Sequence, residues 1–212
     1  LSLLEGRLRT VADLQGGQAP VTGSIEVDAD GFPLEPFLAG SRLAGKLTGQ
    51  LYARADLQGR GTTLEDYLAQ ADGPAALYLR QGRVDKELIN KLGLDPLELF
   101  TARPEAMVEL ECAAARFDLT DGTLNLERLV VVSPELTVNG SGSVDLASGR
   151  LDLTLNPRAQ QPGLLELTGT AQVSGTLSDP QVNPGVDISV APEGAREGCP
   201  QPGGFVGQVA EG

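Results

Sequence analysis

The carboxylates that come closest to a catalytic arrangement lie in two pairs, Glu109 with Glu111 and Asp118 with Asp121. Two carboxyl groups that flank a glycosidic bond can hydrolyse it, one as general acid and the other as base or nucleophile. Glu109 and Glu111, however, share the polar parity of a strand-like run. The chain also has no Trp and only three Tyr to form platforms for sugars. We therefore interpret these carboxylates as part of a solvated face.

Other forms of catalysis lack their usual residues. The chain contains no His, which removes the commonest general base, the Ser-His and Cys-His dyads and the commonest metal ligand. Its three lysines, Lys46, Lys86 and Lys91, follow no Ser-x-x-Lys spacing. We therefore expect a protein that is not an enzyme.

Metal and cofactor sites are not expected either. The acids around Asp145 and Asp152 lack the dense Asp-x-Asp-x-Asp-Gly layout of a calcium loop. The Gly-Ser-Gly at 140–142 lies within a predicted strand and precedes no helix, unlike a phosphate-binding loop.

The two cysteines, Cys112 and Cys199, are too far apart in sequence for a local metal clip. Cys112 lies in a strand-like run and Cys199 in a segment rich in Gly and Pro. A disulfide would attach that segment to the sheet and would imply an oxidising compartment. Two free thiols are the alternative that these residues leave open.

Composition excludes some partners. The 212 residues carry 16 Lys and Arg against 29 Asp and Glu, a net charge of −13 that repels nucleic acid. No stretch approaches the roughly 18 to 20 apolar residues of a membrane helix. The chain begins at Leu1 without Met, so we expect a fragment or a processed product whose membrane contact, if any, lies in a segment absent from it.

Residues 122–180 alternate apolar and polar side chains, strand after strand, with Gly between the strands. Such alternation is typical of strands that bury one face and expose the other. Short connections such as Asp121-Gly122 favour an antiparallel meander. The apolar parity changes within 122–132, which predicts a β-bulge near Glu127 and Arg128. The predicted strands cover residues 107–119, 122–132, 135–146, 149–156 and 165–177.

Helices are predicted only in the middle of the chain. Thr62 and Glu65 form a capping-box pattern that starts a helix ending at Gly73-Pro74. A strand over 75–81 with a turn at Gly82 follows, then a short helix over 85–91 and a third opened by Asp95-Pro96. We expect these two or three helices to cap one end of a long, curved, mainly β sheet. The predicted domain covers 1–185, with a helical insertion at about 62–100 and a flexible Gly- and Pro-rich tail at 186–212, with or without a disulfide tether.

The late strands offer more apolar surface than a soluble monomer leaves exposed. Early strands folding over as a second sheet, the short helices, or a bound apolar ligand such as acyl chains could cover it. A closed sandwich with a dry core is the alternative. We expect the apolar face to consist of Leu136, Val138, Val144, Leu146, Leu151, Leu153, Leu155, Leu165, Leu167 and Val173.

Four motifs in succession resemble the C-terminal region of AsmA-like proteins. Residues 117–122 fit F-D-x-x-D-G, 140–146 fit G-x-G-x-(V/I)-(D/N)-L, 151–157 fit L-x-L-x-L-x-P and 173–180 fit V-x-G-T-L-(S/A)-D-P. The similarity extends over roughly 45–185 and includes the stretch with predicted helices.

The resemblance implies a cell-envelope protein of Gram-negative bacteria, periplasmic and anchored to the inner membrane by an N-terminal segment that this chain lacks. It also implies a groove in which phospholipid or another acyl lipid moves between membranes during outer-membrane biogenesis, with envelope proteins as further partners. A Cys112–Cys199 disulfide is likewise implied. The alternative is a structural β domain that caps a longer assembly and binds protein partners.

Overall fold

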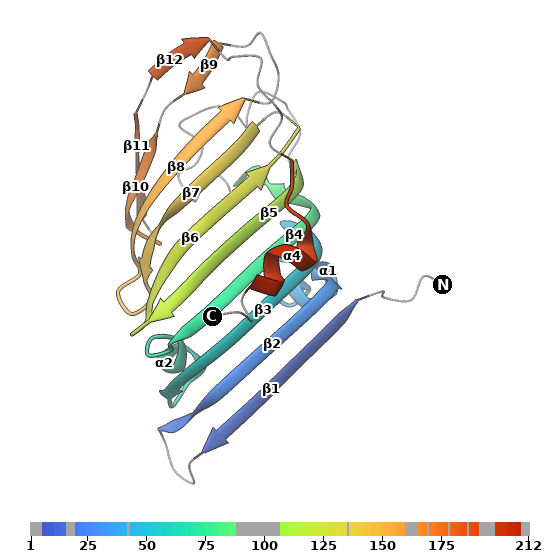
Figure 1. Ribbon diagram of the computed structural model, residues 1–212, viewed down its shortest axis with the longest axis vertical. Coiled ribbons are helices and arrows are strands. Elements are labelled where there is room, and N and C mark those ends of the chain that lie inside the picture. Colours follow the sequence, from blue (N-terminus) through green and yellow to red (C-terminus); the bar gives the residue numbers. More distant parts are fainter. Residues whose placement is uncertain are drawn as a thin grey trace.

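The computed structural model describes residues 6–15, 20–41, 43–87, 107–134, 136–159, 165–168, 170–177, 179–185, 187–190 and 198–208. Most of them form one twisted, antiparallel, ten-stranded sheet (Figure 1). Its strands are β1 (Arg7–Gln15), β2 (Val21–Pro33), β3 (Leu47–Gly61), β4 (Gly73–Asp85), β5 (Met107–Thr120), β6 (Thr123–Val132), β7 (Leu136–Asp145), β8 (Arg150–Ala159), β10 (Ala171–Thr176) and β11 (Asp179–Pro184). The prediction of a mainly β, antiparallel meander is confirmed.

The strands follow one another across the sheet almost in chain order, β1 to β8 and then β10 and β11. From β5 to β8, tight connections explain this order, because a short turn can join only neighbouring antiparallel strands. Asp121 and Gly122 both have positive φ, 47° and 71°, as the primed hairpin turns require. The early strands therefore continue the sheet of the late ones and do not fold over it as a second layer.

The single strand predicted over 165–177 is wrong. Strand β9 (Leu165–Thr168) pairs with β12 (Asp187–Val190) in a separate two-stranded sheet, and only β10 joins the large one. Ala171 lies opposite Leu155 of β8. Beyond this pair the chain leaves the β8 register, and β9 takes β12 as its antiparallel partner instead.

Two bulges interrupt the ladders. In β6 the register with β7 shifts between Leu126 and Leu129, and Glu127 has no partner in β5, which confirms the bulge predicted near Glu127 and Arg128. In β4 the register with β3 shifts beyond Arg80, and Gln81 has a φ of 50°. The turn predicted at Gly82 is therefore wrong, because β4 absorbs the distortion as a bulge and continues to Asp85.

Three short helices occur in the described part of the chain: α1 (Leu34–Leu38), α2 (Leu64–Leu68) and α4 (Pro202–Gly207). Helix α1 was not predicted. At α2 the cap lies one residue later than predicted, because the Thr63 hydroxyl accepts the Asp66 amide at 3.1 Å, while Thr62 donates to the Asp66 carboxylate. The helix predicted over 85–91 lies mostly, and the one opened by Asp95-Pro96 entirely, outside the described residues.

Helix α4 and strand β12 lie in the segment 186–212, for which the sequence predicted a flexible tail. No helix in the part of the chain that the structure describes is long and apolar enough to span a membrane.

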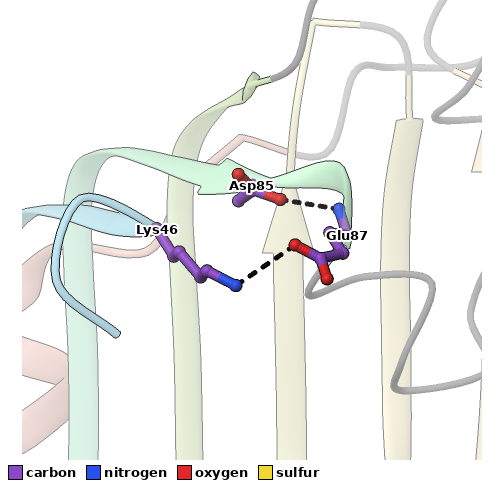
Figure 2. A network of polar contacts seen from close by, with 3 residues as sticks. All are labelled: Lys46, Asp85 and Glu87. Atoms are coloured by element: carbon purple, nitrogen blue, oxygen red, sulfur yellow. Dashed lines mark hydrogen bonds and ion pairs between the residues drawn. The ribbon is translucent and has the colours of Figure 1, made fainter. Parts of the chain in front are cut away.

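A polar network joins the loop before β3 to the end of β4 (Figure 2). The Lys46 ammonium lies 3.2 Å from a carboxylate oxygen of Glu87, and the Glu87 amide donates to the Asp85 carboxylate at 2.7 Å. The Asp85 amide in turn donates to the Lys46 carbonyl. Because the Glu87 side chain is 60% exposed and that of Lys46 33% exposed, we attribute little stability to their ion pair and assign this network to fixing the chain direction.

Candidate lipid-binding face

Cross-strand pairing shows which residues share a side of the sheet, because directly opposed residues point to the same face. We call the side that carries Leu79 the apolar face and the other side the polar face. Three rows of opposed residues cross the apolar face. They are Leu51, Leu79, Ala113, Val131 and Val138; Ala53, Leu77, Ala115, Leu129, Gly140, Leu155 and Ala171; and Ala55, Ala75, Phe117, Leu126, Gly142, Leu153 and Val173.

The bulge in β6 is what keeps the apolar face continuous. Leu126 and Leu129 would point to opposite faces in a regular strand, since three positions separate them. Glu127 and Arg128 together oppose the single residue Ser141 of β7, so Leu126 faces Gly142 and Leu129 faces Gly140 on the same side.

Most of the predicted face residues do lie together. The pairing of β7, β8 and β10 puts one set of them on the apolar face: Leu136, Val138, Val144, Leu151, Leu153, Leu155 and Val173. Leu146 follows β7 and belongs to the cluster of Tyr67 and Leu119, at the margin of the apolar face that α2 covers. Leu165 and Leu167 belong to β9, outside the large sheet, and their side chains are not among those that the structure describes.

The accessible part of the apolar face is elsewhere than predicted. Leu151, Leu155 and Val173 are buried in one cluster at the β7–β10 end, and Leu136 is buried as well. On β4, by contrast, Leu77 keeps 42% of its surface exposed. Half-buried apolar residues adjoin it on the next two strands: Ala115, Phe117, Leu126 and Leu129. The apolar face was predicted on the late strands because their alternation is more regular than that of β4 and β5.

Small side chains shape this central region. Ala53 and Ala115 are the cross-strand neighbours of Leu77, and Ala75 faces Phe117 in the adjacent row. Ala53 and Ala75 are buried between larger residues. The result is a surface of low relief on which a flexible hydrocarbon chain could make contact along several strands.

Short helices cover the two strand-end margins of the apolar face, where one capped end was expected (Figure 1). At the start of β3, α1 packs Leu34 against Leu79, Val108 and Leu110. At the end of β3, the hydroxyl of Tyr67 on α2 lies 3.0 Å from the Gly23 carbonyl oxygen and 2.9 Å from that of Leu57. Burial raises the pKa of Tyr67, and the nearby Asp56 carboxylate adds to the effect. The neutral hydroxyl is thus retained as a donor.

The polar face carries the disulfide. Cys112 on β5 and Cys199 are bonded, with a Cα–Cα distance of 6.0 Å, so the alternative of two free thiols does not hold. The chain beyond Cys199 forms α4, which lies on the sheet over β3 and β4 (Figure 1).

The carboxylates considered for catalysis lie on β5 and in its turn. Glu109 and Glu111 are exposed on β5, and the Thr120 hydroxyl donates to the Asp118 carboxylate at 3.1 Å. The Asp121 amide donates to the Asp72 carboxylate at 2.8 Å, which holds the β5–β6 turn. Among the described residues, no group of three or more His, Cys, Asp or Glu side chains is arranged to hold a metal ion.

These features define a class of protein, an open, one-sided antiparallel sheet whose apolar face is partly solvent-accessible. The carboxylates considered for catalysis are dispersed on it. The model of the AsmA family matches residues 1–129, well over half of the chain. The chain belongs to the AsmA family, whose members are envelope-associated proteins.

A curated relative extends the similarity beyond that region. The AsmA family protein YhjG of Escherichia coli (strain K12) is 24% identical over 178 residues, which is 83% of this chain and 26% of YhjG. The chain thus spans about a quarter of the length of this relative. No solved structure matches.

Proposed function

We propose that the apolar face holds the acyl chains of phospholipid, and that this chain contributes one section of a passive lipid carrier in the cell envelope. The observation that carries the proposal is the exposure of Leu77 at the centre of a continuous apolar face, with half-buried apolar residues around it. Each methylene removed from water contributes about 0.8 kcal/mol. Membership of the AsmA family supports an envelope role.

The mechanism needs no covalent chemistry. Acyl chains lie across the strands along the rows that contain Leu77 and Phe117, while head groups remain in water at the open margin. An acyl chain moves from one row to the next over a low free-energy barrier, because neighbouring rows present similar apolar side chains. The periplasm is the proposed location, with the anchor to the inner membrane in a part of the longer protein outside this chain.

Native mass spectrometry of detergent-free protein, followed by lipid extraction, tests the proposal. Ala115→Trp places an indole beside Leu77 on the accessible region and should lower lipid occupancy at least fivefold. Ser141→Trp is the matched control, because Ser141 is exposed on the polar face of β7. Equal effects of the two variants, or no lipid in the parent protein, would contradict the proposal.

A second candidate function rests on the outer edge of β1, which no described residue covers. Every residue of β1 is exposed, and among the described residues the strand pairs with β2 over nine consecutive positions without a bulge. Leu8 and Leu14, 44% and 54% exposed, extend the apolar face to this edge. A strand from an envelope protein could add here and lengthen the sheet, as in β-augmentation.

Site-specific photocrosslinking separates this scaffolding role from lipid carriage. A photoreactive amino acid at Leu8 should give one discrete protein adduct in cells that express the longer protein. The same group at Leu177, which is 53% exposed away from β1, is the control. Identical adduct patterns at both positions would argue against a docking edge.

A further inference from the structure

An apolar, partly aromatic patch lies beneath α4 on the polar face. We call it the aromatic patch. Tyr52 and Tyr78 face each other across β3 and β4, with ring centroids 6.0 Å apart. Tyr78 is only 2% exposed. The rest of the aromatic patch consists of Ala76, Cys112, Ala114, Val130 and Val132.

Helix α4 covers the aromatic patch with very few contacts of its own. Phe205 and Val206 are its two buried residues, and the Phe205 ring lies 6.3 Å from that of Tyr78. Arg116 donates to the Phe205 carbonyl at 2.9 Å, and its guanidinium carbon lies 4.9 Å from the centre of the Phe205 ring. The buried Nε of Arg116 has no hydrogen-bond partner in the described part of the chain.

The sequence of α4 does not favour a helix that persists by itself. Its six residues, Pro-Gly-Gly-Phe-Val-Gly, include three glycines, which are poor helix formers. A helix this short is unstable in water without tertiary contacts. The covalent link through Cys199, three residues before α4, therefore supplies much of the local concentration that keeps Phe205 on the aromatic patch.

We propose that the Cys112–Cys199 disulfide is a thiol-controlled latch: reduction releases residues 198–208 and exposes the aromatic patch, while the sheet stays folded. The reductant is an external dithiol. Its thiolate attacks Sγ of Cys199, which is half-buried, whereas Cys112 is fully buried.

The exchange balances in two steps. In the first, the protein S–S bond breaks, its electron pair goes to Sγ of Cys112, and that sulfur takes up a proton. In the second, the other thiol of the reagent attacks the mixed disulfide and frees the Cys199 thiol. The protein has then gained two electrons and two protons, and the reagent has become a cyclic disulfide.

Hydrogen exchange measured by mass spectrometry tests the latch on the full chain, oxidised and after treatment with a dithiol under native conditions. The Phe205 amide, which donates to the Gln201 carbonyl, should exchange at least tenfold faster after reduction. Amides of β7 and β8, which α4 does not cover, should be unchanged. Alkylation and mass measurement confirm that both cysteines are free.

The titration of Tyr78 provides an independent readout at the aromatic patch. Burial raises the pKa of this phenol in the oxidised chain. Release of α4 should bring its absorbance titration to lower pH, and Tyr78→Phe identifies the signal against Tyr52 and Tyr67. Cys199→Ser should show both changes without any reagent.

Three results would overturn the proposal. They are resistance of the bond to the dithiol in the native state, continued protection of Phe205 after confirmed reduction, and loss of protection in β7 and β8 together with α4. The last result would make the disulfide a staple of the whole fold. The proposal concerns the polar face alone, so its failure leaves the lipid proposal intact.

Discussion

Single residues set how closely the hairpins of this sheet pack against its helices. At the β5–β6 turn, a Cβ on Gly122 would lie 2.1 Å from the carbonyl oxygen of Ala69, just after α2. At the β7–β8 turn, Gly149 has nearly the same φ, 69° against 71°, but nothing lies within 4 Å of a Cβ placed there. The two glycines therefore share a backbone requirement, and only one of them also has a steric requirement.

Gly149→Ala should lower the free energy of unfolding by about 1 kcal/mol, the strain of a left-handed alanine. Gly122→Ala should lower it by at least about 3 kcal/mol, because α2 must also move away from the turn. Urea denaturation of both variants measures the difference. Equal losses would show that the contact with Ala69 adds nothing.

At the scale of elements, the bulge in β6 reconciles a change of sequence parity with one continuous apolar face. Glu127 is the extra residue, since Arg116 pairs with Arg128 and Phe117 with Leu126. Without Glu127, Leu126 and Leu129 would be two positions apart, and both would still point to the apolar face. Removing the extra residue together with its bulge would thus change the local twist and leave the apolar face as it is.

Deleting Glu127 should therefore change the free energy of unfolding by no more than about 1 kcal/mol, while it removes a local distortion. Deleting Asn125, another exposed residue two positions earlier, should cost about 2 kcal/mol because it turns Leu124 away from the apolar face. Urea denaturation gives both values. A larger loss for the Glu127 deletion would mean that the bulge itself is needed for folding.

At the scale of the whole molecule, an apolar surface is carried on a strongly acidic protein. The net charge is −13, and the two described ion pairs, Lys46–Glu87 and Arg54–Asp28, leave most acids unneutralised. Long-range repulsion should therefore keep the chain from anionic membranes. Hydrophobic contact with the apolar face does not depend on the charge of the lipid head group. Electrostatics and hydrophobic contact act on lipid uptake in opposite ways.

Lipid uptake should consequently be roughly tenfold faster from phosphatidylcholine vesicles than from vesicles that contain phosphatidylglycerol, when both are measured at low ionic strength. Added salt should shrink the difference, because the Debye length falls to about 10 Å at 0.1 M. Transfer of a pyrene-labelled phospholipid, followed by fluorescence, provides the rates. A preference that salt does not alter would point to a specific head-group contact.

The local features of the sheet could be predicted because they depend on neighbouring residues. Alternation placed β5 to β8 within a few positions, the parity change located the bulge at Glu127, and Asp121-Gly122 marked a hairpin turn. The capping pattern found α2 with an error of one residue, since Thr62 and Thr63 are chemically equivalent candidates for the cap. The late strands of the apolar face could be predicted because their apolar and polar residues alternate strictly.

What the sequence by itself determined was a one-sided antiparallel sheet, its hairpins and its lack of the usual catalytic residues. Only the tertiary structure decided that all these strands join one open sheet, that β9 leaves it, and that Leu77 rather than Leu151 is exposed. It also decided which face α4 covers and joined Cys112 to Cys199 across 87 residues. Periodicity fixes which face a side chain shares with its near neighbours, but exposure and long-range pairing depend on how distant strands and helices pack.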